Sequence, residues 1–454
     1  MTADKARLLG AEAVKRVIDE GAYASLVIDQ TLKSAEQELN EREQRFFTTL
    51  VYTTIEHQAA IDAVIGKVSK TPIEKMKPFV RALLRIGVCQ LWYLDGVKPH
   101  AAVYETVGVI KASKMRNLAP FVNGVLRAVQ REEKPAADGE SLLSVPDWVV
   151  SMWEKDYGEE RCRYLTQIVK TKRPVCVRRN PLKLSAEAFE AALRETLETS
   201  AQSGNASVKR GTLAEGAYYL ERTGNIGAWK LYQNGSLSVQ DESSMVAAMM
   251  ADAKSGERIL DLCAAPGGKS MVMAESMGNI GEIISRDLHE HRVCLIEENA
   301  RRLGLTIIKA EQGDATKALE KDAEAFDKVL ADVPCSGLGI LRSKPDIALH
   351  HTEEDHQNLL QLQRQILETA VKAVRDGGRL IYSTCTLSKD ENENQVLAFL
   401  EDHPEMHLID LTGKLPSLPG EDGVLGCGLT LWPVDGGHDG FYVAVMEKTM
   451  AHKP

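Results

Sequence analysis

Two cysteines stand at the ends of two apolar, β-branched runs of this sequence. Cys335 lies in "ADVPCSG", residues 331–337, and Cys385 lies in "IYSTCTL", residues 381–387. If both runs are strands of an open α/β sheet, both thiols lie near its carboxyl edge, where such sheets bind their ligands. A thiolate at that edge can attack an electron-poor carbon and form a covalent intermediate.

One reaction that would use two thiols is methylation of a pyrimidine at carbon-5. This carbon is a poor nucleophile until a thiolate adds to C6; C5 then accepts a methyl group, and loss of the C5 proton expels the thiolate. The scheme needs a methyl donor and benefits from a group that assists the elimination. Cys335 and Cys385 could supply the nucleophile and the assistant, although a single cysteine at a strand end is more often a packing residue.

The sequence also contains a candidate site for a methyl donor. The segment "DLCAAPGGKS", residues 261–270, ends a strand with Gly267 and Gly268, which let backbone amides approach a ligand at a helix N-terminus. Asp287 and Asp314 end the next two strands, where an acid can bind ribose hydroxyls or meet an adenine edge. Any one aspartate could merely cap a helix. Together they suit a ligand with ribose and adenine but no phosphate, which is S-adenosylmethionine.

The elements that would position these residues alternate between strands and helices after Gln240. The strands are "RILDLCAAP", "GEIISRDL", "IIKAEQGDA", "FDKVLADVP" and "GGRLIYSTC", with amphipathic stretches such as "LLQLQRQILETAVKAVRDG" among the helical pieces. This alternation predicts parallel crossovers and a Rossmann-like, doubly wound α/β domain at 226–450.

The remainder of the chain predicts a multidomain protein. Apolar residues recur at helical spacing through residues 1–133, which indicates an all-α domain. Residues 134–145 are polar and aperiodic, as in a linker. Residues 146–225 mix helical and alternating patterns, which predicts a small α+β domain; a spacer is the alternative.

Composition limits the classes of function. The chain has 454 residues and a formal net charge of -10, so any nucleic-acid surface must be a local patch. It contains no signal-peptide pattern or membrane-spanning stretch, and we expect a cytoplasmic protein without a membrane partner. The eight cysteines are scattered, with no CxxC and no Cys/His cluster, so we expect reduced thiols and no metal site.

Several segments carry a family resemblance. "DLCAAPGGKS", "ADVPCSGLG" and "YSTCTLSKDENENQV" resemble the signature motifs of the RNA 5-methylcytosine methyltransferases, and "QDESSM" and "HDGFYVAVMEK" match that family's flanking segments. "PFVNGVLRAV" resembles the NusB-like RNA-binding domain of the Fmu, Sun or RsmB branch, which methylates bacterial 16S ribosomal RNA. The resemblance covers nearly the whole chain. It implies S-adenosylmethionine as cofactor and a cytosine of 16S ribosomal RNA as substrate; we expect a monomer.

The resemblance also implies roles for single residues. Cys385 would attack the base and Cys335 would aid product release. Asp332 could also hold the cytosine edge, because a carboxylate accepts from the exocyclic amine. Ser270, Thr386 and Val333 depart mildly from the family pattern, which leaves only fine positioning in doubt. The implied cofactor contacts are Cys263, Ala264, Ala265, Pro266, Gly267, Gly268, Lys269, Asp287, Asp314 and Asp332.

Two basic segments are candidates for RNA contact. "KTKRPVCVRR", residues 170–179, carries five basic residues and no acid, and on a strand it could contact phosphates. The alternative for either segment is a solvated face. The side chains predicted to bind RNA in this strip are Lys172, Arg173, Arg178 and Arg179. The second candidate set, in the helical domain, is Lys111, Lys114, Arg116, Arg127 and Arg131.

Other functions are open to the same sequence. The chain could be an RNA-binding assembly factor with a vestigial methyltransferase fold, but such a protein needs neither cysteine. An amino-directed methyltransferase would show Asn/Asp-Pro-Pro-Tyr in place of "DVPC". In DNA cytosine methyltransferases the Pro-Cys thiol attacks, so the roles of Cys335 and Cys385 would be exchanged. The Thr-Cys motif and the N-terminal domain favour RNA.

Overall fold

The computed structural model describes residues 4–35, 37–134, 145–171, 173–199, 207–415 and 427–449. Residues 135–144 of the predicted linker and Lys172 of the basic strip lie outside them. The chain divides by its contacts into two compact units. One comprises Met1–Ser151 with Lys344–His351, and the other comprises Met152–Ser343 with Thr352–Pro454. No helix in the described part is long and apolar enough to cross a membrane.

The first unit is helical, as its apolar periodicity predicts. Its core lies between the helices and contains Val14, Phe47 and Leu83, all fully buried. A short segment from far along the chain joins it, because Asp346 accepts a hydrogen bond of 3.0 Å from the backbone N–H of Ala24. The elements are α1 (Lys5–Ile18), α2 (Ala24–Ser34), α3 (Glu41–Glu56), α4 (Gln58–Val68), η1 (Ile73–Lys75), α5 (Pro78–Trp92), α6 (Pro99–Ala112), η2 (Arg116–Leu118), α7 (Ala119–Val129) and α14 (Ile347–His350).

The second unit contains the α+β substructure predicted for residues 146–225. Its antiparallel sheet has the strand order β2-β3-β1-β4, and β4 extends it past the predicted boundary at residue 225. Phe189 and Leu193 of α9 pack against this sheet. The elements are α8 (Asp147–Ile168, which starts before the unit boundary and is broken at Gly158), β1 (Val175–Arg179), α9 (Ala186–Thr199), β2 (Ser207–Arg210), β3 (Ala217–Glu221), η4 (Ile226–Ala228), α10 (Lys230–Gln233) and β4 (Leu237–Val239).

The larger sheet of the second unit is the predicted Rossmann-like sheet. Its order is β10-β12-β9-β8-β5-β6-β7, with β11 paired to β12. The five predicted strands, β5 to β9, are parallel, and β12 is antiparallel to β9. The strands are β5 (Arg258–Asp261), β6 (Glu282–Asp287), β7 (Ile308–Gln312), β8 (Phe326–Asp332), β9 (Val374–Thr384), β10 (Met406–Leu408), β11 (Leu429–Leu431) and β12 (Phe441–Lys448).

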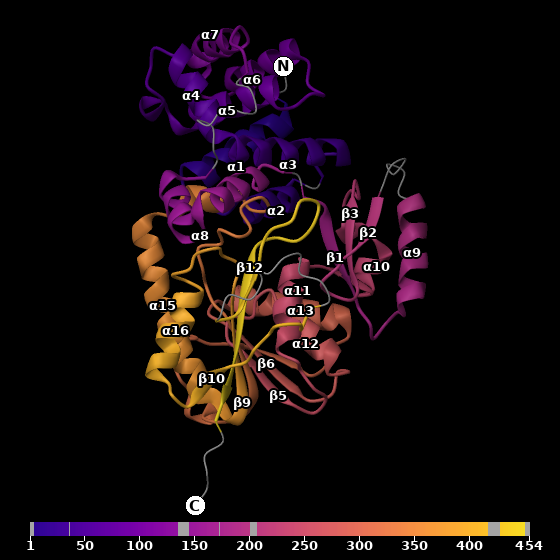
Figure 1. Ribbon diagram of the computed structural model, residues 1–454. Helices are drawn as coiled ribbons and strands as arrows, with labels where there is room; N and C mark the ends of the chain where they lie inside the picture. Colours follow the sequence, from indigo (N-terminus) through magenta and orange to yellow (C-terminus); the bar gives the residue numbers. More distant parts are fainter. Residues whose placement is uncertain are drawn as a thin grey trace, which may run out of the picture. The chain divides into compact units, whose positions relative to one another are not determined.

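Helices cover both faces of this sheet. Figure 1 shows α15 and α16 on one face and α11, α12 and α13 on the other. Successive strand residues alternate between the faces: Ile283 belongs to the core under α12 and α13, whereas Ile284 belongs to the core under α15. The helices are α11 (Glu242–Met250), α12 (Gly268–Ser276), α13 (Glu290–Leu303), α15 (Glu353–Ala373) and α16 (Glu393–Asp402).

Close packing of α5 against α7 requires a glycine. A Cβ at Gly87 would lie 2.7 Å from Leu126 Cδ2, whereas a Cβ at Gly66 of α4 would meet nothing within 4 Å. Replacement of either by alanine gains similar helix propensity, about 0.5–1 kcal/mol. We therefore expect Gly87→Ala to be less stable than Gly66→Ala by roughly 1–3 kcal/mol, the usual cost of overpacking. Hydrogen exchange of the α5 amides measures this; equal protection in both variants would contradict it.

Candidate active site

The two predicted cysteines meet at the carboxyl edge of the large sheet. β8 and β9 are parallel neighbours, and their register pairs Asp332 with Ser383. Cys335 follows three residues after one of these and Cys385 two residues after the other. Their Sγ atoms are 3.4 Å apart, and both side chains are half-buried. The structure therefore brings both thiols within reach of one reacting base.

Glycines allow the loops around the thiols to approach one another. Gly337 has a φ of +70°, so the chain turns directly after the Pro-Cys segment. The backbone N–H of Gly339 donates to the carbonyl of Cys385 at 3.0 Å. A Cβ at Gly339 would lie 2.4 Å from the carbonyl oxygen of Gly440. Three segments therefore pack backbone to backbone around the thiols.

The surroundings of the Cys335 thiol disfavour its ionisation. The hydrogen bond with Cys385, followed by burial and the nearby Glu391 carboxylate, raises the pKa of the Cys335 thiol well above its usual value. Each of these effects penalises a thiolate at Cys335. Cys335 is therefore held as a neutral thiol, which suits proton transfer better than nucleophilic attack.

A partly buried ion pair lies beside the thiols. Lys269 donates to Asp332 Oδ2 at 2.6 Å, and Ser383 donates to Asp332 Oδ1 at 2.8 Å. The Lys269 ammonium also lies 4.9 Å from the centroid of the Phe441 ring. Burial opposes the charge on Lys269, but Asp332 outweighs it and raises the pKa of Lys269. A carboxylate accepts about four hydrogen bonds, so Asp332 keeps capacity for a ligand.

The glycine turn after β5 surrounds a second buried carboxyl group. Ser270 donates to Asp261 Oδ2 at 2.6 Å, and Ser285 donates to the Ser270 hydroxyl at 2.7 Å. Asp261 Oδ1 is buried and has no hydrogen-bond partner among the described residues. Burial raises the pKa of Asp261 from 3.8 to about 7. An unsatisfied buried acceptor at a glycine turn is suited to a bound group that donates hydrogen bonds.

The ends of β6 and β7 supply two further carboxylates. Asp287 is buried, and its contacts to the backbone of Ala265 and His289 and to Arg292 are all 3.2–3.3 Å long. Such long contacts leave its oxygens able to accept from ligand hydroxyls. Asp314 is more exposed, and hydrogen bonds from Thr316 and Lys317 lower its pKa to about 2. The donor and acceptor set around this turn fits the adenosine and amino acid parts of S-adenosylmethionine.

Comparison with known proteins identifies the family. The family model for NusB matches residues 4–131, and the model described as 16S rRNA methyltransferase RsmB/F matches residues 248–447. The "Probable ribosomal RNA small subunit methyltransferase B" of Bacillus subtilis (strain 168) is 38% identical over 453 residues, which cover 97% of this chain and 98% of that protein. The chain belongs to the RsmB/F family of 16S rRNA methyltransferases. Its cofactor is S-adenosylmethionine.

Two further similarities extend along the whole chain. A protein of Synechocystis with the same description is 34% identical over 454 residues, covering 98% of this chain and 99% of that protein. The crystal structure of PH0851 matches with a TM-score of 0.83 at 26% identity, covering 98% of this chain and all of that chain. The family and the NusB-like domain predicted from the motifs are confirmed.

The basic strip of this RsmB/F family member lies largely inside the protein. Arg178 is 4% exposed and forms an ion pair with Glu275. Arg173 forms ion pairs with Asp241 and Asp439. In the middle of β1 both faces are covered, because Cys176 and Val177 point to opposite faces and both are buried. The guanidinium groups of Arg173 and Arg178 therefore anchor protein segments instead of forming a surface strip for phosphates.

Arg179 is the remaining arginine of the strip. Its side chain is 10% exposed, donates to the carbonyl of Leu184 at 2.8 Å and lies 3.4 Å from Glu215. The three arginines of the strip thus offer little free positive charge, because each is bonded within the protein. Lys170 of the strip is exposed.

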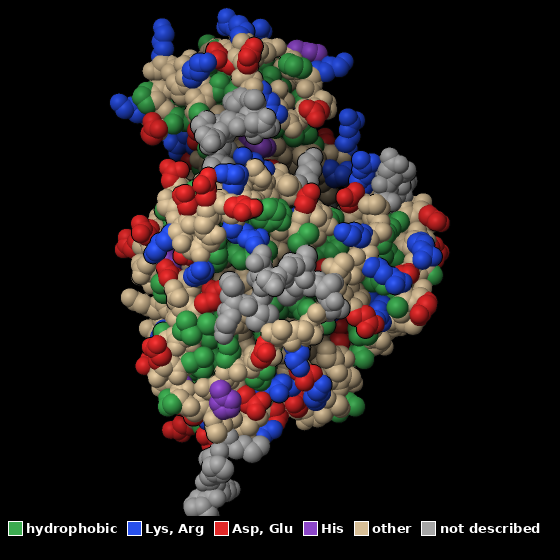
Figure 2. Space-filling view, in the orientation of Figure 1, with side chains coloured by type: hydrophobic (Ala, Val, Ile, Leu, Met, Phe, Trp, Pro, Cys, Tyr) green, Lys and Arg blue, Asp and Glu red, His purple; other side chains and the backbone are tan. Residues whose placement is uncertain are grey.

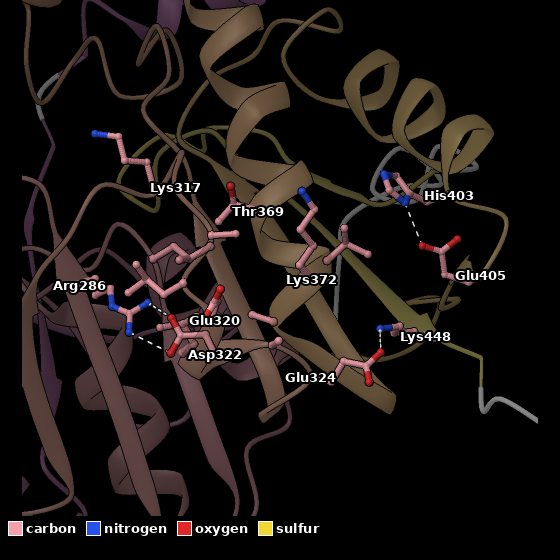
Figure 3. A pocket seen from close by; sticks show the side chains of 17 residues that line it. Arg286, Lys317, Glu320, Asp322, Glu324, Thr369, Lys372, His403, Glu405 and Lys448 are labelled. Carbon is pink, nitrogen blue, oxygen red and sulfur yellow. Dashed lines mark hydrogen bonds and ion pairs between the residues drawn. The ribbon is translucent and has the colours of Figure 1, made fainter. Parts of the chain in front are cut away.

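A separate pocket of about 610 Å³ lies on the α15 side of the sheet. Figure 3 shows charged side chains that pair around it: Arg286 with Asp322 and Lys448 with Glu324. It contains none of the predicted site residues. Because Arg286 directly precedes Asp287 on β6, the two side chains point to opposite faces. The pocket is therefore distinct from the edge that holds the thiols.

Sequence reasoning missed some residues of the site. Phe441 follows the glycine in "HDGFYVAVMEK", which was matched only as a flanking segment, and no spacing rule places its ring beside Lys269. Glu391 and Asn392 stand within the Thr-Cys signature, but they lie six and seven residues beyond Cys385. The sequence places all three residues inside recognisable motifs, but it does not indicate which residues they contact.

The raised pKa of Asp261 predicts a pH dependence of stability. The folded protein binds this proton more tightly than the unfolded chain, so the group favours folding most below pH 4, and this contribution is lost as pH rises to about 7. The Asp261→Asn variant lacks this titration. We expect the unfolding free energy of the wild type to fall between pH 4 and 7 by on the order of 2–4 kcal/mol more than that of Asp261→Asn. Urea unfolding across this range measures the difference; parallel curves would contradict the assignment.

Proposed function

We propose that this protein transfers a methyl group from S-adenosylmethionine to carbon-5 of a cytosine in 16S ribosomal RNA, through a covalent bond between Cys385 and C6. The observation that carries the proposal is the 3.4 Å separation of the Cys335 and Cys385 sulfurs beside the Asp332 carboxylate. A methyltransferase that attacks a base nitrogen or oxygen needs neither thiol. Two thiols in contact fit a reaction that must both form and break a carbon–sulfur bond.

The proposed sequence of steps is consistent with the contact between the two sulfurs and with the raised pKa of the Cys335 thiol. The Cys385 thiolate adds to C6, and the electron pair displaced to C5 bonds to the methyl carbon. When bound, S-adenosylmethionine would supply that electrophilic methyl group, and its methyl–sulfur bond would break to leave S-adenosylhomocysteine. The C5 proton then leaves, C5=C6 reforms and the Cys385–C6 bond breaks. Cys335, a neutral thiol in contact with Cys385, donates its proton to the departing sulfur and takes up the C5 proton. The Cys385 thiol then loses its proton to solvent, which restores the starting thiolate.

Asp332 supports the choice of cytosine. Its carboxylate oxygens accept from Lys269 and Ser383 and keep further capacity. The exocyclic amine of cytosine can donate to such a carboxylate, whereas uracil presents an oxygen at that position, which a carboxylate repels.

The proposed cofactor contacts are those assigned in the sequence analysis. Asp287 would accept from the ribose hydroxyls and Asp314 would lie by the adenine, with the turn from Cys263 to Lys269 against the amino acid part. The long contacts of Asp287 support this assignment. Lys269, which the motif placed in the cofactor site, also contacts Asp332 and thus stands between cofactor and base.

The cysteine roles predict two different mutant behaviours. Cys385→Ser should abolish both methylation and any covalent RNA complex, because a serine hydroxyl stays protonated near neutral pH and attacks far more weakly. Cys335→Ser should still attack but release slowly, so an RNA adduct that resists denaturant should accumulate. Denaturing gels with 16S ribosomal RNA and S-adenosylmethionine measure both.

The double variant is the control, and it should form no adduct because trapping requires prior attack. An adduct that forms in Cys385→Ser but not in Cys335→Ser would show that the Pro-Cys thiol attacks, as in DNA cytosine methyltransferases. That outcome would overturn the assignment of roles.

We also propose that α6 and α7 of the helical unit contact the RNA. A groove of about 740 Å³ lies between them, with Lys111 and Arg127 in its lining and no carboxylate among the described residues that line it. Tyr104 lines it too and is 55% exposed. Lys and Arg side chains project from the part of this unit where Figure 1 places α6 and α7 (Figure 2). Cations beside an exposed aromatic ring suit phosphates next to a stacked base.

Neutralising this groove should weaken RNA binding. We expect the triple change of Lys111, Arg127 and Arg131 to Gln to lower RNA affinity and to reduce the salt slope by about 0.7–0.9 per lost phosphate contact. The same change at the exposed Lys70, Lys75 and Lys77 of this unit removes equal charge and serves as the control. RNA-binding titrations at several salt concentrations measure both; equal slopes in the two variants would place the RNA elsewhere.

A further inference from the structure

Glu391 is a fully buried carboxylate beside the Pro-Cys loop. Its exposed fraction is 0%, and it accepts hydrogen bonds from the backbone N–H of Ser336 at 2.9 Å and from the Ser336 hydroxyl. Gln363 Nε2 donates both to Glu391 at 2.8 Å and to the carbonyl of Pro334 at 3.0 Å. The residues before and after Cys335 are thus held by one bonded pair of side chains.

Asn392 binds the loop that carries Cys385, as Glu391 binds the loop that carries Cys335. It too is fully buried. The Thr384 hydroxyl donates to Asn392 Oδ1 at 2.6 Å, and Asn392 Nδ2 donates to the carbonyl of Thr386 at 3.1 Å. These two threonines flank Cys385. Both residues next to the second thiol are therefore held by the side chain that follows Glu391 in sequence.

A hydrogen bond between two hydroxyl groups joins the contacts of Glu391 to those of Asn392. Ser336 Oγ and Thr386 Oγ1 are 2.6 Å apart. Because the single hydroxyl proton of Ser336 goes to Glu391, the Thr386 hydroxyl is the donor in this pair. The bonds from Glu391 through Ser336 and Thr386 to Asn392 form a closed loop under both cysteines.

Helix capping does not explain these side chains. Asn392 occupies the N-cap position of α16, yet its side chain makes no capping hydrogen bond and turns to the Cys385 loop instead. Glu391 precedes the helix, and burial of its carboxylate is costly without compensating donors. His356 Nδ1, 3.4 Å from Glu391 Oε1, adds a further polar group on that side.

We propose that the adjacent pair Glu391 and Asn392 positions the two thiols, with Glu391 setting Cys335 and Asn392 setting Cys385. The hydrogen bonds described above join neither side chain to a sulfur atom. Each acts through the residues that flank a cysteine, so both are positioning residues. The inference that they set the thiol spacing stands on geometry alone, and their effect on methyl transfer rests on the function proposed above.

Isosteric variants test the pair. Glu391→Gln removes the charge and places an amide N–H₂ among donors, and Asn392→Asp removes the donor to Thr386. Glu393→Gln and Asn394→Asp are matched controls on the same segment: Glu393 is also buried but contacts Thr430, and Asn394 donates to Asp390. Neither control residue contacts a cysteine loop through these bonds.

The first readout needs no RNA. Hydrogen peroxide oxidises two neighbouring thiols to a disulfide and is itself reduced to two molecules of water. We expect Asn392→Asp to slow formation of the Cys335–Cys385 disulfide, mapped by mass spectrometry, several-fold relative to wild type and to both controls. Glu391→Gln should also slow it, although loss of the Glu391 charge favours ionisation of Cys335. Rates equal to those of the controls would overturn the proposal.

The second readout separates the two positions during catalysis. Glu391→Gln should let the RNA adduct persist, and Asn392→Asp should slow adduct formation in the Cys335→Ser background. In each, kcat should fall roughly 10- to 100-fold, as for misplaced reacting groups, while KM for RNA stays within about twofold. A merely structural role would raise KM and weaken S-adenosylmethionine binding together with kcat, which would count against positioning.

The readouts also separate this proposal from the function. Slower disulfide formation without any adduct in any variant would support the positioning role and overturn the covalent mechanism. If Glu391→Gln or Asn392→Asp fails to fold, Ser336→Ala and Thr384→Val each remove one hydroxyl of the network. Both changes should also slow disulfide formation, and unchanged rates in both variants would overturn the proposal.

Discussion

The parallel pairing of β8 with β9 is the constraint on which the active edge depends. Parallel strands end at the same edge, and the register of Asp332 with Ser383 brings the two following loops into contact. The antiparallel strand β12 on the other side of β9 brings the segment before Phe441 to the same edge. Three motifs that are far apart in sequence thereby line one site. A slip of one residue between β8 and β9 would separate the sulfurs and turn Asp332 away.

Buried charge keeps these loops in place. Asp332, Glu391 and Asp439 are carboxylates at or near the edge, and each has fixed donors. An unpaired buried carboxylate costs far more than a hydrogen bond gains, so any movement of the loops that removes a donor is penalised. Arg173 and Arg342 meet at Asp439 and tie the Pro-Cys loop to the start of β12. Hydrogen bonds and ion pairs to these carboxylates thus hold the site in place together with apolar packing.

Arginines serve two purposes in this acidic protein. On β1 they are buried and paired, and they join the small sheet to the methyltransferase core. On α6 and α7 cations face solvent around a groove that lacks acids. With a formal net charge of -10, the protein would repel a polyanion at long range, so local placement of cations matters more than their number. The amino-acid composition does not distinguish the buried arginines from the exposed cations; only their burial in the folded protein does.

The sequence by itself determined the element order, the helical N-terminal unit, the α/β rhythm and the residues of the glycine turn and the thiols. These are local signals: apolar periodicity sets helices and strands, and a strand end followed by glycine places its neighbours at a carboxyl edge. The motifs also sufficed for the family. Cys335 and Cys385 could be paired from sequence because both follow strands of one parallel sheet.

Tertiary structure decided what each side chain faces. Arg173 and Arg178 stand in a basic run that resembles a phosphate strip, but ion pairs with Asp241 and Glu275, distant in sequence, hold them inside. Glu391 and Asn392 look like helix-start residues, yet they turn back to the cysteine loops. Phe441 meets Lys269 only because β12 inserts antiparallel beside β9. Burial and hydrogen-bond partners depend on segments that are distant in sequence, and no local pattern of residues encodes them.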